Sequence, residues 1–261
     1  MISYSQNFED VVLNRLFHDL PTGRYIDVGA ENPVTDSVTK HFYEKGWSGI
    51  NIEPVTTYWN KLVQDRPRDI NLNVLVGATQ GEVPFFEIER TGLSTMKTPP
   101  PSDTLHSLGF SGTPSVKPMT TLKHIVDSYG FETIEFLKID VEGAEKEVLL
   151  GADFQTFRPK VILIESVAPV LELRYGHYAV PVWDEFEDLL LSSGYLFGLF
   201  DGLNRFYYRQ ESPEFKDLLS YPACVLDNFK LHPNHGMNGK EQVRLRNHLI
   251  QLIKKRLLPD S

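Results

Sequence analysis

The sequence predicts an α/β fold built on a mostly parallel sheet, with helices on both faces and a C-terminal antiparallel hairpin. In the first half of the chain, apolar β-branched runs alternate with segments of helical periodicity, which is the pattern of a parallel sheet covered on both sides. Later, two aromatic-rich runs flank Asp201-Gly202-Leu203-Asn204, and Asp-Gly between two strands indicates a hairpin. A hairpin makes its two strands antiparallel.

The first half begins with an N-terminal helical extension, expected within residues 1–22. Ser5 is a candidate N-cap, and apolar residues from Phe8 to Leu16 recur at helical spacing. The next elements are expected to be a strand at 24–28, a helix from Asp36 through Tyr43 that stops at Gly46, a strand at 50–52, a helix containing Trp59 and Leu62, and a strand at 72–76.

The second half begins with a change of composition. Residues 91–118 are rich in Pro, Ser and Gly, so we expect a long loop that acts as a lid. The elements expected around and after it are a helix at 121–129, strands at 134–139 and 161–164, a helix at 181–191, and the hairpin strands at 195–200 and 205–208.

Composition limits the size and the partners of the protein. With 261 residues, 41% of them hydrophobic, the chain can bury one substantial core, expected at 1–228. A formal net charge of -9 argues against a nucleic-acid partner, because neutralising phosphates requires clustered Lys and Arg. Cys224 is the only cysteine, which excludes an intramolecular disulfide. With neither a secretory signal nor a membrane span in the sequence, a cytoplasmic location is expected.

Residues 229–261 are expected to form a basic C-terminal helical tail. Between Lys240 and Arg256 there are six basic residues and one acidic residue, and apolar residues recur at helical spacing beside them. Such a helix could lie on an anionic membrane surface or contact a protein partner. The more common alternative is a helix packed on its own domain, and the sequence is also compatible with an oligomer.

A cofactor site is predicted at the ends of the first two strands. Asp27-Val28-Gly29 stands where the first strand turns into a helix, and Gly29 would let the backbone approach a ligand closely. Glu53 ends the second strand, where a carboxylate can accept hydrogen bonds from both hydroxyls of a ribose. The alternatives are a turn glycine and an exposed acid. NAD is disfavoured, because Glu31 and Val34 occupy the two further glycine positions of the dinucleotide fingerprint.

Several segments together resemble FkbM-type methyltransferases, in the subgroup that begins with Ser-Gln-x-x-Glu-Asp. They cover residues 4–227 and include, in order, Ser5-Gln6-Asn7-Phe8-Glu9-Asp10, Ile26-Asp27-Val28-Gly29-Ala30, Gly49-Ile50-Asn51-Ile52-Glu53-Pro54, Leu93-Ser94-Thr95, Thr121-Leu122, Leu137-Lys138-Ile139-Asp140-Val141-Glu142-Gly143-Ala144-Glu145 and Phe200-Asp201-Gly202-Leu203-Asn204-Arg205-Phe206-Tyr207. One departure is Pro33, which stands where the last glycine of the cofactor loop is usual.

The resemblance implies a Rossmann-like class I methyltransferase sheet and S-adenosyl-L-methionine as the cofactor. It implies that Asp27 and Gly29 lie near the methionine part of the cofactor and Glu53 at its ribose. It also implies O-methylation of a sugar or glycoconjugate hydroxyl, in surface polysaccharide or natural-product biosynthesis. Two alternatives stay open at this point: an NAD-dependent oxidoreductase, motivated by Glu53, and a cofactor-binding module without catalysis.

Asp140 and Glu165 end neighbouring strands and are expected to point into one cleft. Methyl transfer to oxygen must remove a hydroxyl proton, so either carboxylate could be the base, or both could hold Mg²⁺ or Ca²⁺. The alternative is that Asp140 caps the next helix, with Glu142 and Glu145 complementing the helix dipole. His177, in the loop after Glu165, is a further candidate base, although a lone loop histidine is more often a surface residue.

Overall fold

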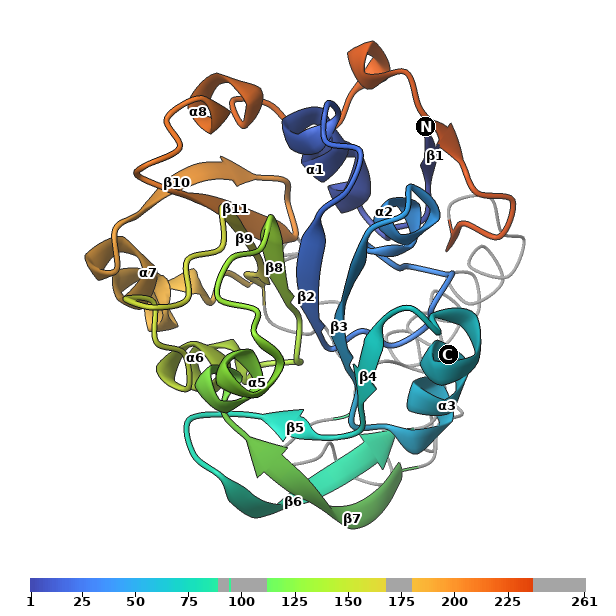
Figure 1. The fold of residues 1–261 in the computed structure, drawn as a ribbon, viewed down its shortest axis with the longest axis vertical. Coiled ribbons are helices and arrows are strands. Elements are labelled where there is room, and N and C mark those ends of the chain that lie inside the picture. Colours follow the sequence, from blue (N-terminus) through green and yellow to red (C-terminus); the bar gives the residue numbers. More distant parts are fainter. Residues whose placement is uncertain (89–93, 95–111, 168–179, 237–261) are drawn as a thin grey trace, which may run out of the picture.

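The computed structural model describes residues 1–88, 94, 112–167 and 180–236, and these residues form the predicted α/β fold (Figure 1). A seven-stranded sheet has the order β10-β11-β9-β8-β2-β3-β4. Its strands are β2 (Arg24–Val28), β3 (Ser48–Ile52), β4 (Ile70–Leu72), β8 (Phe136–Ile139), β9 (Val161–Glu165), β10 (Tyr195–Phe200) and β11 (Asn204–Arg209). Neighbours from β9 to β4 are parallel, whereas β11 is antiparallel to both β9 and β10. The predicted fold class is confirmed.

Both faces of the large sheet are buried. Side chains alternate along β2, so Ile26 and Val28 join one apolar cluster and Tyr25 joins the other. The first cluster includes side chains of α5 (Leu122–Tyr129), α6 (Glu145–Leu150) and α7 (Glu187–Ser192). The second includes side chains of α1 (Glu9–Phe17), α2 (Lys40–Glu44) and α8 (Phe215–Leu218). A further helix, α3 (Thr56–Asp65), is tied to β4 by a hydrogen bond from Trp59 Nε1 to the Asn71 carbonyl at 3.0 Å.

Two helices begin later than predicted. Ser5 is not the N-cap of α1, because Phe8 precedes the helix in a left-handed conformation with φ 67°. The Ser5 hydroxyl nevertheless accepts the backbone N–H of Asp10 at 3.1 Å. Asp36 is not the cap of α2 either: it has φ 59° and forms an isolated β-bridge with Ser5. The helix therefore starts only at Lys40.

The predicted strand at 72–76 is wrong, because the chain leaves the large sheet after β4. Asn73 Nδ2 donates hydrogen bonds to the backbone oxygens of Glu53 and Pro54 at 2.8 and 3.0 Å. This side chain ties the chain to the end of β3 and turns it away from the sheet. The following residues form a separate strand, β5 (Leu75–Val76).

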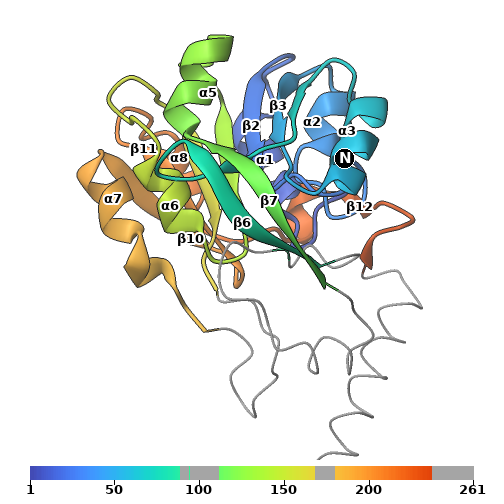
Figure 2. The same cartoon turned by 90° about the horizontal axis from the view of Figure 1, so that it is seen from below.

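β5 belongs to a three-stranded sheet of order β5-β7-β6, which the sequence did not predict (Figure 1). Figure 2 shows its strands β6 and β7 side by side. Its other strands are β6 (Gly81–Ile88) and β7 (Gly112–Thr120), paired antiparallel. The predicted loop at 91–118 is therefore wrong for residues 112–118. Apart from Ser94, the rest of that loop lies outside the described residues. Pro114 and Pro118 are tolerated in β7 because, among the described strands, only β6 pairs with that part of it.

The predicted helix at 181–191 is divided in two. A short 3-10 turn, η1 (Trp183–Glu185), precedes α7, and Phe186 between them has φ -134°. Phe186 is only 2% exposed and packs in the first apolar cluster. Burying this ring interrupts the helix.

The Ser-Gln-x-x-Glu-Asp segment is held by buried polar contacts. The carboxylate of Asp10 is fully buried and accepts hydrogen bonds from the hydroxyls of Ser3 and Ser5 and from the Tyr4 N–H, each at 2.7 Å. Beside it, β1 (Ile2–Ser3) pairs with β12 (Lys230–Leu231). Of the predicted C-terminal tail, residues 237–261 lie outside the described residues. No helix in the described part of the chain is long and apolar enough to cross a membrane.

Glu9 makes the stability of this segment depend on pH. Burial, together with the charge of Asp201, raises the pKa of Glu9 from 4.5 to about 7. The folded state thus binds the proton more tightly than the unfolded state, so this stabilisation is present below pH 4.5 and is lost as the pH rises through about 7. We expect the free energy of unfolding to fall by about 2–3 kcal/mol more in the wild type than in Glu9→Gln between about pH 5 and about pH 8. Urea unfolding of both proteins measures this, and parallel pH profiles would contradict it.

Candidate active site

A pocket with about 680 Å³ of empty space, part of it open solvent, lies at the carboxyl ends of β2, β3 and β8. This is the edge at which open parallel sheets bind ligands. The pocket is lined by apolar, acidic and hydroxyl side chains together with one glycine: Val28, Gly29, Glu31, Ile52, Glu53, Pro54, Val55, Tyr58, Val74, Leu75, Val76, Phe85, Ser94, Asp140, Val141 and Glu142.

Gly29 lets the ends of β2, β3 and β8 meet at the floor of this pocket. Its φ is +81°, and a Cβ atom added there would lie 1.8 Å from the carbonyl oxygen of Asp140. Its N–H donates to the Ile52 carbonyl at 3.0 Å. Only glycine fits, so this residue brings the ends of β2, β3 and β8 together as well as lining the pocket.

Lys138 is a buried cation directly behind the pocket. Its ammonium group donates to the Gly29 carbonyl at 2.6 Å and lies 3.3 Å from carboxylate oxygens of both Asp27 and Asp140. Although burial opposes the charge, Asp140 and Asp27 raise the pKa of Lys138, so it stays protonated. Asp27 also accepts a hydrogen bond from Thr39 at 3.2 Å and is absent from the pocket lining. The predicted cofactor residue Asp27 therefore reaches the pocket through Lys138.

Glu53 stands at the end of β3 in the pocket wall, and its two oxygens accept the backbone N–H groups of Glu31 at 2.8 Å and Val55 at 2.7 Å. Burial raises the pKa of Glu53 to about 7. Glu31 itself has φ 46°, and its carboxylate is hydrogen-bonded to the Tyr58 hydroxyl. Two carboxylates are thus held in fixed positions where β2 and β3 end.

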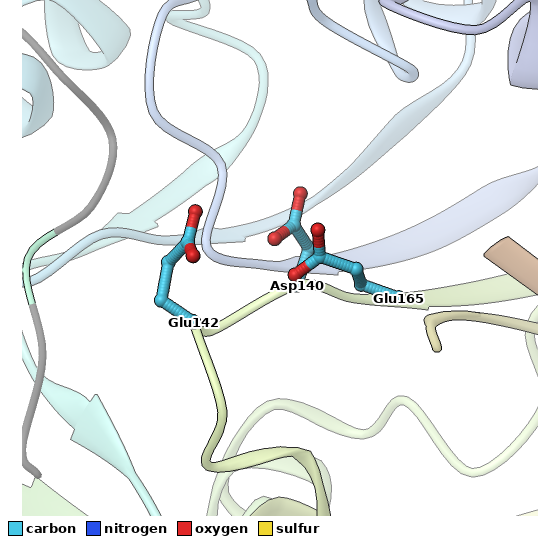
Figure 3. A group of neighbouring side chains, drawn as sticks. All are labelled: Asp140, Glu142 and Glu165. Carbon is cyan, nitrogen blue, oxygen red and sulfur yellow. The ribbon is translucent and has the colours of Figure 1, made fainter. Parts of the chain in front are cut away.

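Asp140 and Glu165 do lie together, and Glu142 joins them (Figure 3). One carboxylate oxygen of each residue lies within 4.8 Å of the others, a spacing that would allow them to hold a metal ion. Burial, with the charges of Asp140 and Glu142, raises the pKa of Glu165 to about 11, and a hydrogen bond joins it to Asp140. For Glu142, burial and the charge of Asp140 raise the pKa to about 9. The crowded carboxylates therefore retain protons that a cation could replace.

Sequence reasoning missed the position of Glu142. The alternative interpretation of Asp140 had Glu142 complementing the dipole of the next helix, but Glu142 has φ 57° and α6 begins only at Glu145. The signal available was Gly143, which marks a turn rather than a helix start directly after Asp140. Ser94, which had no assigned role, lines the pocket, and its hydroxyl accepts the N–H of Ile88 at 2.9 Å. His177 lies outside the described residues.

Comparisons with known proteins bear on the identity of this site. No curated protein matches the chain. A solved structure of a TehB-like SAM-dependent methyltransferase from Corynebacterium glutamicum shares 8% identity, with 76% of this chain and 87% of that chain covered and a TM-score of 0.38. The methyltransferase FkbM domain matches residues 27–197, which include the end of β2, the whole of β3, β8 and β9, and all the acidic residues of the pocket and cluster. The chain belongs to the FkbM family of S-adenosylmethionine-dependent methyltransferases.

Proposed function

We propose that the chain transfers a methyl group from S-adenosylmethionine to a hydroxyl of a sugar or glycoconjugate. The observation that supports this best is that Asp140 and Glu142 line the pocket and also belong to the cluster with Glu165. The pocket and the carboxylate cluster therefore share one edge of the sheet. Carboxylates also accept hydrogen bonds from hydroxyl pairs, which is what a sugar presents.

The charges of the pocket suit this cofactor. Four lining residues are acidic and, among the described residues, no lining residue is Lys, Arg or His. S-adenosylmethionine has a positively charged sulfur, whereas NAD has an anionic pyrophosphate that usually binds at a glycine-rich helix start. An acidic pocket favours the sulfonium and repels the pyrophosphate. This argues against the alternative of an NAD-dependent oxidoreductase.

The same edge of the sheet carries a side chain that can take up the hydroxyl proton of the acceptor. S-adenosylmethionine supplies a methyl group on a charged sulfur; the acceptor oxygen bonds to the methyl carbon while the carbon–sulfur bond breaks, and the hydroxyl proton must leave. Asp140 is placed to receive it, because Asp140 lies at the boundary between the pocket and the cluster. Lys138 holds this carboxylate at 3.3 Å and so fixes its orientation.

We extend the proposal to Mg²⁺ or Ca²⁺ held by Asp140, Glu142 and Glu165. All three offer the oxygen ligands that hard cations prefer, and three crowded carboxylates need a counter-charge beyond the one ion pair with Lys138. A bound cation would supply a lowered pKa for a coordinated sugar hydroxyl.

The test is methyl transfer itself. We expect tritium from methyl-labelled S-adenosylmethionine to appear in an alkali-stable ether when the protein is given sugars, nucleotide sugars or lipid-linked glycans. Label on an amine or a carboxylate instead would contradict O-methylation. Binding of the cofactor without transfer to any acceptor would favour the non-catalytic module.

Glu53 provides a separate test of the cofactor orientation. We expect Glu53→Ala to weaken S-adenosylmethionine binding by about 1–3 kcal/mol, because a charge-assisted acceptor for the ribose is lost together with the anchor of the Glu31 loop. Calorimetry measures the affinity, and Glu82→Ala, an exposed acid on β6, is the matched control. Equal affinities of the wild type and folded Glu53→Ala would remove Glu53 from the site.

A further inference from the structure

The charged side chains that line the pocket are acidic. Its acidic lining residues come from three places: Glu31 after β2, Glu53 after β3, and Asp140 and Glu142 after β8. Within the described part of the chain, no basic side chain lines the pocket to offset them. Glu31 and Glu53 line the pocket but do not belong to the cluster of Asp140, Glu142 and Glu165.

Lys138 does not supply the missing positive charge to a ligand. Lys138 is only 8% exposed, and its ammonium is already bonded to the Gly29 carbonyl at 2.6 Å, with Asp27 and Asp140 each at 3.3 Å. These partners occupy the donors of the ammonium group, and two carboxylates already balance its single charge. A ligand in the pocket therefore meets acidic side chains that no basic lining residue offsets, among the described residues.

Among the acidic lining residues, Glu31 is in the best position to act on the ligand independently of the carboxylate cluster. Its backbone N–H donates to Glu53 at 2.8 Å, and its φ is 46°. Burial raises the pKa of Glu31, whereas the hydroxyl of Tyr58, another lining residue, donates to its carboxylate and so favours the ionised form. Glu31 is not part of the carboxylate cluster.

Methyl transfer changes the charge of the molecule in this pocket. When the carbon–sulfur bond breaks, its electron pair stays on sulfur, so the sulfonium cation becomes a neutral thioether, S-adenosylhomocysteine. The methyl group and the positive charge leave the sulfur together, and the hydroxyl proton passes to the cluster.

We propose that the acidic pocket, through Glu31, binds S-adenosylmethionine more tightly than S-adenosylhomocysteine, so that loss of the sulfonium charge promotes product release. This inference rests on the proposed function. The pocket then selects its ligand by charge. After methyl transfer it holds S-adenosylhomocysteine, which binds less tightly than S-adenosylmethionine. The enzyme should consequently resist inhibition by its own product.

Calorimetric titration of the full chain with three ligands tests the inference: S-adenosylmethionine, S-adenosylhomocysteine, and sinefungin, which has a charged amine near the position of the sulfonium. We expect the wild type to bind S-adenosylmethionine and sinefungin roughly tenfold or more tightly than S-adenosylhomocysteine. In Glu31→Gln this preference should shrink roughly tenfold, with the affinity for S-adenosylhomocysteine almost unchanged. Glu82→Gln makes the same charge change outside the pocket and should keep the wild-type ratio.

The outcomes separate the two proposals. If both ligands bind the wild type equally, or the product binds more tightly, the charge selection is wrong while the methyltransferase site stands. An unchanged ratio in Glu31→Gln also overturns the role of Glu31. If neither S-adenosylmethionine nor S-adenosylhomocysteine binds, the proposed function itself is contradicted. Glu31→Asn, which also tolerates a left-handed backbone, replaces the Gln variant if that protein does not fold.

Discussion

Replacing Lys138 with Met is expected to destabilise the fold by about 3–5 kcal/mol and to abolish binding of S-adenosylmethionine, because it leaves the buried carboxylate of Asp27 and the half-buried carboxylate of Asp140 without their cation. Asp27 and Asp140 each lie 3.3 Å from the lysine ammonium, and Gly29 would lose the 2.6 Å hydrogen bond that fixes its carbonyl. Urea unfolding measures the first effect, and calorimetry at low temperature measures the second.

A double variant distinguishes the lost ion pair from a packing defect. Adding Asp27→Asn to Lys138→Met removes one of the uncompensated charges, so we expect part of the lost stability to return, as a thermodynamic cycle would show. If Lys138→Met unfolds within about 0.5 kcal/mol of the wild type, Lys138 is not the buried counter-ion described above.

Replacing Glu165 with Gln is expected to slow methyl transfer by about 10²–10⁴-fold while leaving the affinity for S-adenosylmethionine nearly unchanged, because an amide replaces one carboxylate ligand of the cation that would assist loss of the hydroxyl proton. Glu165 belongs to the carboxylate cluster but does not line the pocket, whereas Asp140 and Glu142 do both. The variant therefore separates the acceptor side of the site from the cofactor side. Single-turnover rates and calorimetry on the same preparation measure the two effects.

Glu132→Gln is the matched control, because Glu132 is an exposed acid that precedes the opposite end of β8. Chelation provides a second test. Excess EDTA should stop methyl transfer while S-adenosylmethionine stays bound, and added Mg²⁺ should restore methyl transfer. Full activity in chelator would contradict the cation, and full activity of Glu165→Gln would contradict any part for the cluster in the reaction.

The sequence predicted the site where sheet topology alone determined it. Asp140 and Glu165 each come directly at the end of a buried strand, and the ends of neighbouring parallel strands must meet, so their proximity follows from the strand assignments. Glu142 could not be found in this way. Its place depends on a left-handed turn after β8, and a single acid near a helix start suits a dipole just as well.

Other parts of the structure depend on contacts between residues far apart in the chain. The departure of β5 from the large sheet rests on Asn73 reaching back to Glu53 and Pro54, which no local propensity indicates. The prolines of β7 suggested a loop. A strand tolerates proline where it has no second neighbouring strand, and the local sequence does not reveal its neighbours. For Lys138 a signal did exist: a lysine within the apolar strand Phe136–Ile139 requires a buried partner.

Calorimetric titration of the purified chain with S-adenosylmethionine and with NAD shows whether the pocket at the ends of β2, β3 and β8 is the S-adenosylmethionine site. The acidic lining and the fixed position of Glu53 predict saturable binding of one S-adenosylmethionine per chain and no measurable binding of NAD. Saturable binding of NAD with none of S-adenosylmethionine would show that the pocket is not this site.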